Sequence, residues 1–183
     1  MELQCRILIL YDQGDLVDIL AQSVAEGART FPESDVVLQR PRQTSKNDLE
    51  MADALIFGSP NWTGIKGSLK LWMDTTGDLW EEGGLAGKVG AAFTSSAGNH
   101  SGTEFTLLNV LHWFLGNGMV IVGLPWTPTM ERSGSYYGAT AIGQVTDEDR
   151  EQARALGRRV AHIARQLKIG GDSGDYSDLD VLI

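Results

Sequence analysis

The stretch from Ala52 to Gly64 reads ADALIFGSPNWTG, and its first half is a short apolar run of the kind that forms a buried strand. The run ends at Ser59-Pro60, so the polar residues after it form a loop at the C-terminal end of that strand. Leucine, tryptophan and methionine side chains over residues 69–73 then indicate a helix behind the loop. The stretch therefore predicts a strand, a loop and a helix in succession.

The same succession recurs on both sides of this stretch. RILILY, residues 6–11, is nearly continuous in apolar character, as in a strand buried on both faces of a parallel sheet. The expected strands are residues 6–11, 35–38, 52–58, 89–94 and 119–124, and helical spacing is found over residues 16–27, 69–73, 105–115 and 147–168. Residues 41–48 are expected to be a loop with one helical turn, and residues 125–144 an irregular functional loop.

Strands that alternate with helices predict an α/β fold with a doubly wound, five-stranded parallel sheet, strand order 2-1-3-4-5 and helices on both faces. The last helix opens at Thr146 with Asp149 three residues later, an approximate capping box, and Gly170-Gly171 is expected to stop it. We therefore predict one domain over residues 1–169 and an acidic, mobile tail over residues 170–183.

Composition excludes several functional classes. The formal charge of −9 and the pI near 4.7 disfavour nucleic-acid binding. No apolar run approaches the ~20 residues that span a bilayer, which argues against membrane insertion, and the first residues lack a secretory signal, so we expect a cytoplasmic protein. Cys5 is the only cysteine and begins an apolar strand, which favours a buried, inert thiol over a nucleophile. A chain of 183 residues needs no metal or cross-link to be stable.

Ligands of open parallel sheets bind outside the carboxyl ends of the strands. The loops expected at that edge are residues 11–15, 59–66 and 94–102.

At these loops the chain resembles the WrbA-type NAD(P)H:quinone oxidoreductases of the flavodoxin-like family, and the resemblance covers nearly its whole length. The matching segments are ADALIFGSPNWTG (52–64), DTTGDLW (74–80), GLAGK (84–88), FTSSAGNHSGTE (93–104), GMVIV (118–122) and YGAT (137–140).

The resemblance implies a flavodoxin-like fold that binds FMN, uses NAD(P)H as co-substrate, reduces a quinone-like acceptor and assembles as a homodimer or homotetramer. The flat FMN ring is edged with hydrogen-bonding groups that backbone amides suit, and Trp62 or Trp80 offers an aromatic surface. Trp62 at a subunit contact and Trp80 in a packing role are the alternatives. The cofactor residues implied are Gln13, Gly14, Ser59, Pro60, Asn61, Trp62, Thr63, Gly64, Thr94, Ser95, Ser96, Ala97 and Gly98. The substrate-pocket residues implied are Trp80, His100, Asn117 and Tyr137. His100 is the candidate catalytic side chain, with a solvent-facing or interface role as its alternative.

The chain departs from the family in its first loop. No hydroxyl residue follows Tyr11 before Ser23, and Asp12, Asp15 and Asp18 bring negative charge to a position that normally binds the FMN phosphate. If Asp12 and Asp15 occupy the phosphate position, a like-charge contact near 4 Å costs on the order of 4 kcal/mol at an effective dielectric of ~20.

Two further departures lie outside this loop. Family members have an arginine where Trp62 stands, and Asn117 stands where they commonly have a histidine.

The leading hypothesis is an FMN-dependent oxidoreductase that transfers two electrons from NAD(P)H to a quinone-like acceptor. The alternative is a flavodoxin-like protein that has lost FMN and acts as a binding or assembly partner, or holds an unphosphorylated aromatic ligand. A one-electron flavodoxin carrier is disfavoured by the long segment 125–144.

Overall fold

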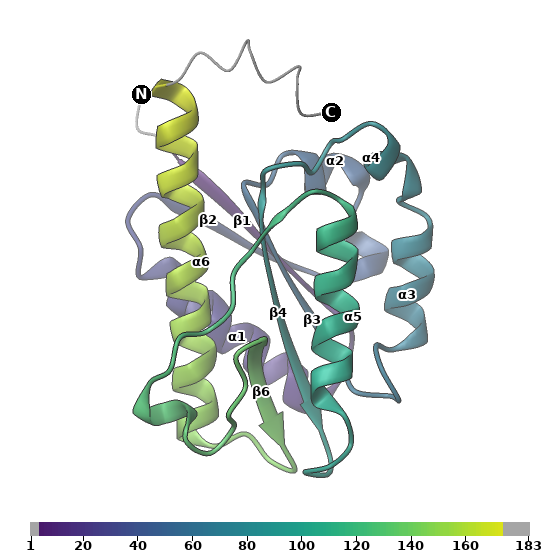
Figure 1. Ribbon diagram of the computed structural model, residues 1–183, viewed down its shortest axis with the longest axis vertical. Coiled ribbons are helices and arrows are strands. Elements are labelled where there is room, and N and C mark those ends of the chain that lie inside the picture. Colours follow the sequence, from purple (N-terminus) through teal and green to yellow (C-terminus); the bar gives the residue numbers. More distant parts are fainter. Residues whose placement is uncertain (1–3, 174–183) are drawn as a thin grey trace.

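The computed structural model describes residues 4–173 of the chain. It has three layers, with a twisted sheet between two layers of helices (Figure 1). The strands are β1 (Cys5–Tyr11), β2 (Ser34–Gln39), β3 (Ala54–Pro60), β4 (Val89–Ser96), β5 (Val120–Ile121) and β6 (Gly138–Ile142). The helices are α1 (Asp15–Arg29), α2 (Lys46–Glu50), α3 (Gly67–Asp74), α4 (Gly77–Glu81), α5 (Thr103–Gly116) and α6 (Asp147–Ser173), with 3-10 turns η1 (Pro41–Gln43) and η2 (Pro128–Met130).

The predicted strand order is confirmed. The sheet runs β2-β1-β3-β4-β5 with parallel pairing throughout, and β6 also pairs in parallel with β4. A parallel order of this kind requires crossover helices on both faces. Figure 1 shows α1 and α6 on one face and α3 and α5 on the other.

The prediction for the fifth strand was wrong in its extent. Instead of a strand over residues 119–124, β5 is a two-residue strand beside the start of β4, and β6 pairs with the end of β4. The segment between them leaves the sheet and returns where the Leu124 N–H donates to the Tyr136 carbonyl at 3.0 Å. The segment 125–144 is therefore not wholly irregular, because β6 lies within it and completes the edge of β4 that β5 leaves unpaired.

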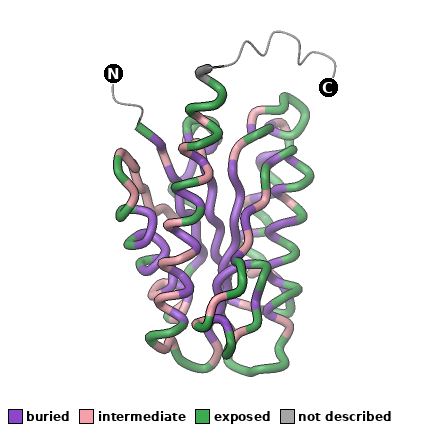
Figure 2. The backbone as a smooth tube through the Cα atoms, turned by 60° about the vertical axis from the view of Figure 1, so that its left-hand side comes forward, coloured by how far each residue is buried: buried purple, intermediate pink, exposed green. Residues whose placement is uncertain are grey.

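The central strands β1, β3 and β4 are buried on both faces, as their apolar runs predict, whereas the edge strand β2 is only partly buried. In β1, Ile7 and Ile9 pack under α1 and α6, while Leu8 and Leu10 pack under the opposite helices. Figure 2 shows the buried strands running through the centre of the molecule with exposed residues on the outer sides of the helices. This alternation divides the core into two clusters that hold the sheet from either side.

Two glycines let α1 and α6 pack with their backbones in contact. A Cβ atom at Gly27 would lie 2.0 Å from the Arg154 carbonyl oxygen, and one at Gly157 would lie 2.0 Å from the Val24 carbonyl oxygen. Since real Cβ atoms do not approach so closely, only glycine fits at either position. This contact sets the position of α6 relative to α1. It therefore also sets the position of the first turn of α6 beside β6.

The start of α6 agrees with the prediction, and its end does not. The predicted capping box is confirmed, because the Thr146 N–H donates to Asp149 Oδ2 at 2.9 Å and the Asp149 N–H donates to Thr146 Oγ1 at 3.3 Å. Gly170-Gly171 does not stop the helix, which continues to Ser173, since glycine weakens a helix by about 1 kcal/mol without forbidding it. The remainder of the predicted tail, residues 174–183, lies outside the described residues.

None of the helices within residues 4–173 is long and apolar enough to cross a membrane.

Candidate functional site

The register of the parallel strands brings three loops to the carboxyl edge of the sheet, at the lower end of Figure 1. Tyr11 at the end of β1 lies beside Gly58 of β3, and Ser59 of β3 lies beside Thr94 of β4. The loops that follow β1, β3 and β4 therefore start at nearly the same level. The predicted convergence of these loops is present in the structure.

The loops after β3 and β4 are joined directly. The Asn61 side-chain amide donates to the Ser101 carbonyl at 2.7 Å, and the Asn61 N–H donates to the Ser95 carbonyl at 2.8 Å. Beyond Asn61 the chain makes a tight turn in which Thr63 and Gly64 have φ values of 55° and 115°, in the region that favours glycine. This turn leaves the side chain of Trp62 70% exposed.

Several hydroxyl groups predicted to contact a ligand also form hydrogen bonds within this part of the chain. Thr94 Oγ1 donates to the Ser59 carbonyl at 2.7 Å, and Ser59 Oγ accepts from the Lys66 N–H at 2.9 Å. Ser96 Oγ donates to the Gly98 carbonyl at 2.9 Å. These side chains shape the loops, so backbone groups and exposed residues such as Trp62 form their outer surface.

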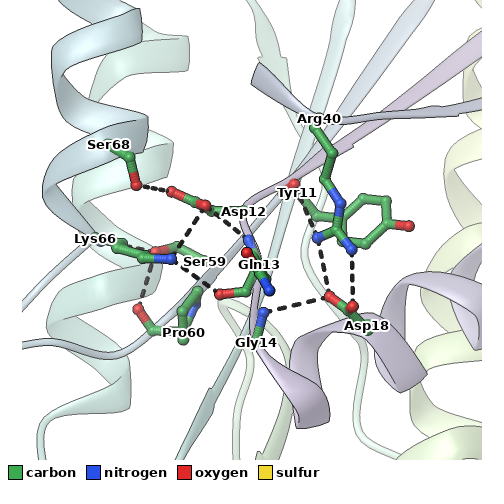
Figure 3. A network of polar contacts seen from close by, with 10 residues as sticks. All are labelled: Tyr11, Asp12, Gln13, Gly14, Asp18, Arg40, Ser59, Pro60, Lys66 and Ser68. Carbon is green, nitrogen blue, oxygen red and sulfur yellow. Dashed lines mark hydrogen bonds and ion pairs between the residues drawn. The ribbon is translucent and has the colours of Figure 1, made fainter. Parts of the chain in front are cut away.

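The first loop contains a network of polar contacts that sequence analysis did not anticipate (Figure 3). Asp12 is 7% exposed, and its carboxylate accepts hydrogen bonds from the Ser68 hydroxyl and from the Gln13 N–H, the latter at 2.7 Å. Lys66 Nζ lies 3.4 Å from Asp12 Oδ1 and donates to the Gln13 carbonyl at 3.2 Å. The Asp12 carboxylate therefore bonds to α3 and to its own loop.

A second charged group is held on the other side of the same loop. The Arg40 guanidinium bonds to both carboxylate oxygens of Asp18, at 2.9 and 2.7 Å, and its centre lies 4.0 Å from the centroid of the Tyr11 ring. The bond to Asp18, more than any other contact, raises the pKa of Arg40 above its usual value, so this side chain stays charged.

The hypothesis that Asp12 and Asp15 both occupy the phosphate position is corrected in part. The Asp12 carboxylate is bound by donors from the chain, and Asp15 is exposed in the first turn of α1. Arg40, Lys66 and Ser68 were missed as site residues. Arg40 follows β2, whereas Lys66 and Ser68 lie together at the start of α3, and the one local signal was that Lys66 lies in the loop expected after the third strand.

Two cavities open at this edge. One, of about 320 Å³, is lined by the network just described together with Arg42. The other, of about 290 Å³, lies between the loop after β4 and the segment before β6, where the buried carboxylate of Asp149 is 3.8 Å from the Arg132 guanidinium. Both are lined by charged and hydroxyl side chains and suit polar parts of a ligand.

The predicted substrate-pocket residues do not form one pocket within the chain. Trp80 and Asn117 line a common cavity of about 350 Å³ with Trp113, but α4 and the end of α5 place it at the opposite edge of the sheet (Figure 1). His100 lies exposed in the loop after β4, and Tyr137 lies just before β6. The predicted order of elements already put Asn117 just before the strand expected over residues 119–124, at the amino edge, whereas its proximity to Trp80 depends on where α4 packs.

The three loops fit the flat ring of a flavin better than its phosphate. Trp62 and the backbone of the turn from Asn61 to Gly64 present an apolar surface and polar edges of the kind that a ring requires. A phosphate requires donors that are not already bound to an anion, and the donors around Asp12 are bound to its carboxylate. The ring half of the site is therefore suitable, whereas the donors around Asp12 are already used by its carboxylate.

Comparisons with known proteins agree with this architecture. Over 121 residues, which are 66% of this chain and 63% of the relative, the chain is 47% identical to the NAD(P)H dehydrogenase (quinone) of Archaeoglobus fulgidus. It is 36% identical to the NAD(P)H dehydrogenase (quinone) of Syntrophobacter fumaroxidans, with 88% of this chain and 97% of that protein aligned.

Among solved structures, a WrbA-like flavodoxin protein from Agrobacterium tumefaciens superimposes with a TM-score of 0.71 at 25% identity, covering 89% of this chain and 98% of that chain. The predicted WrbA-type, flavodoxin-like resemblance is thereby confirmed. The family model described as NADPH-dependent FMN reductase matches residues 15–128, and the chain belongs to that family.

Proposed function

We propose that this protein is a cytoplasmic, FMN-dependent oxidoreductase that transfers two electrons from NAD(P)H to a quinone-like acceptor. The observation that carries the proposal is the convergence of the loops after β1, β3 and β4 on one edge of the sheet, with Asn61 joining two of them. Membership of the FMN reductase family and the names of the full-length relatives support the choice of donor and acceptor.

The bound flavin supplies the redox chemistry, and the protein supplies placement and exclusion of water. The turn from Asn61 to Gly64 and the segment from Thr94 to Gly98, which includes the end of β4, border the ring, and the bond from Asn61 to Ser101 holds the two at a fixed separation. His100 lies in the same loop and is exposed, which leaves it available to a second substrate.

The proposal includes assembly into a homodimer or homotetramer. Trp80 and Asn117 lie at the opposite edge of the sheet from the three loops, so they reach a flavin only from a second copy of the chain. The outer face of α5 supports an interface, because Phe105, Leu108 and Leu115 are exposed there. Large apolar side chains grouped on one exposed face are typical of association surfaces.

The test is flavin-dependent oxidation of NADH and of NADPH by the purified protein with a simple benzoquinone as acceptor. We expect turnover that requires added flavin, and we expect Asn61→Ala to raise the concentration of FMN needed because it releases the loop after β4. Asn47→Ala, at an exposed asparagine in α2, is the matched control and should behave as the unaltered protein. Absence of flavin-dependent turnover would refute the proposal.

One observation favours a second candidate function. The donors of the first loop are satisfied within the chain, as expected of a flavodoxin-like protein that has lost FMN and acts as a binding or assembly partner. This candidate predicts that neither FMN nor riboflavin binds.

A further inference from the structure

The loop after β1 has no backbone N–H left to offer to a phosphate. The Asp12 N–H donates to the Gly58 carbonyl at 3.0 Å, and the Gln13 N–H donates to the Asp12 carboxylate at 2.7 Å. The Gly14 N–H is directed at Asp18 Oδ1 at 3.4 Å. Phosphate sites at the start of a helix use such loop amides together with the first amides of the helix. Each loop amide here already has an acceptor, which leaves the first amides of α1, and Asp15 and Asp18 bring carboxylates to that same turn.

The side-chain donors beside the loop are taken in the same way. The Lys66 ammonium and the Ser68 hydroxyl, both from the start of α3, converge on the Asp12 carboxylate (Figure 3). An ammonium, a hydroxyl and an amide around one anionic group are the donors that a bound phosphate uses. Asp12 is therefore an anion supplied by the chain where a ligand's phosphate would be held.

The cavity of about 320 Å³ beside this loop attracts a dianion only weakly, because most of its cationic side chains are already paired. Its cations are Arg40, Arg42 and Lys66, of which Arg40 is paired with Asp18 and Lys66 with Asp12. A phosphate monoester carries nearly two negative charges at neutral pH. Its entry would place it against the Asp12 and Asp18 carboxylates, which already hold these donors.

The loop after β1 also lies so close to β3 that little space is left for a phosphate. A Cβ atom at Gly14 would lie 3.3 Å from the side chain of Pro60, so the loop lies directly on the end of β3. Only the residues from Asp12 to Gly14 separate β1 from α1, which leaves no slack for the loop to open around a phosphate.

We infer that this protein recognises its flavin through the ring and the sugar-alcohol chain and not through the phosphate, because the Asp12 carboxylate takes the place of the phosphate. Riboflavin and other unphosphorylated flavins are then ligands equal to FMN. The inference rests on the proposed function, since it concerns the flavin of that same site.

The first experiment compares binding isotherms of FMN and riboflavin on the unaltered protein, followed by quenching of flavin fluorescence. We expect the dissociation constant of riboflavin to equal that of FMN within about threefold, or to be lower, because the donors that bind Asp12 are not available to the phosphate. This comparison needs no variant and so does not depend on whether a variant folds.

The second experiment replaces Asp12. Asp12→Ser releases Lys66, Ser68 and the Gln13 N–H, and FMN affinity should rise roughly ten- to hundredfold while riboflavin affinity changes little. Asp15→Ser is the matched control. It removes the same charge from the start of α1, but Asp15 is exposed, so FMN affinity should change by less than about threefold.

The outcomes separate the inference from the function on which it rests. If FMN binds the unaltered protein at least tenfold more tightly than riboflavin, the inference is wrong and the proposed function stands. An equal gain in FMN affinity for Asp12→Ser and Asp15→Ser also overturns it, because general charge would then explain the effect. If neither flavin binds, the inference and the proposed function both fail.

Discussion

Lys66 and Asp12 form an ion pair in which Nζ lies 3.4 Å from Oδ1, and the pair ties the start of α3 to the loop after β1. Because the Asp12 side chain is only 10% exposed, loss of its cation leaves a carboxylate that water solvates poorly. We expect Lys66→Met to lower the free energy of unfolding by about 1–3 kcal/mol in urea titrations. Lys70→Met is the control, since its partner Asp74 is more than half exposed, and it should cost less than about 1 kcal/mol.

The same pair can be tested by a double-mutant cycle. Once Lys66→Met is present, Asp12→Asn should cost less than it does alone, because the uncompensated charge has been removed. Strict additivity of the two substitutions would show that the pair contributes no coupling and that its position is incidental.

The contact between α1 and α6 predicts a large effect of a single methyl group. Gly157→Ala places a Cβ atom 2.0 Å from the Val24 carbonyl oxygen, so the helices must separate, at a cost of about 1–3 kcal/mol or more. Gly116→Ala in α5 is the matched control, because nothing lies within 4 Å of its Cβ position, and alanine is the better helix former. Thermal unfolding of both variants checks this, and a similar loss in each would contradict it.

Cys5 makes stability depend on pH in the alkaline range. Burial, helped by the nearby Asp53 carboxylate, raises the pKa of the Cys5 thiol from 9.0 to about 11. The unfolded chain therefore loses this proton at lower pH than the folded chain does. The stabilisation is fully present below pH 9.0 and is lost as the pH rises towards about 11, at about 1.4 kcal/mol per unit.

The comparison with Cys5→Ala isolates that contribution, since the variant lacks the thiol. The difference in free energy of unfolding between the two proteins should shrink between pH 9.0 and about pH 11. In the native state the thiol should also react slowly with alkylating reagents, as its complete burial requires. A pH-independent difference would mean that the folded thiol titrates normally.

The exposed face of α5 predicts where copies of the chain associate. Leu115→Glu should lower the mass measured by light scattering, because it places a charge in an apolar interface. Leu167→Glu introduces the same charge at an exposed leucine of α6 and should leave the mass unchanged. A monomeric mass for the unaltered protein at micromolar concentration would contradict the proposed assembly.

Local pattern was sufficient for the first four strands, for the four longer helices α1, α3, α5 and α6, and for the edge at which the loops meet. Helices cover both faces of a strand such as residues 6–11, so nearly all of its consecutive side chains must be apolar, and this can be read from the sequence. Strand order 2-1-3-4-5 then brings the ends of β1, β3 and β4 together. The loops that follow β1, β3 and β4 were for this reason assigned correctly to one edge of the sheet.

The direction of the Asp12 side chain depends on residues far away in the chain. Its partners Lys66 and Ser68 are 54 and 56 positions further on, and no pattern around residue 12 indicates that a lysine and a serine will lie within reach. The same holds for β6, which forms because β5 leaves the end of β4 unpaired, and for Trp80 and Asn117, which meet at the far edge because α4 and α5 end there. Periodicity within one element specifies which of its faces is buried, whereas contacts between elements depend on how the completed sheet sets their ends side by side.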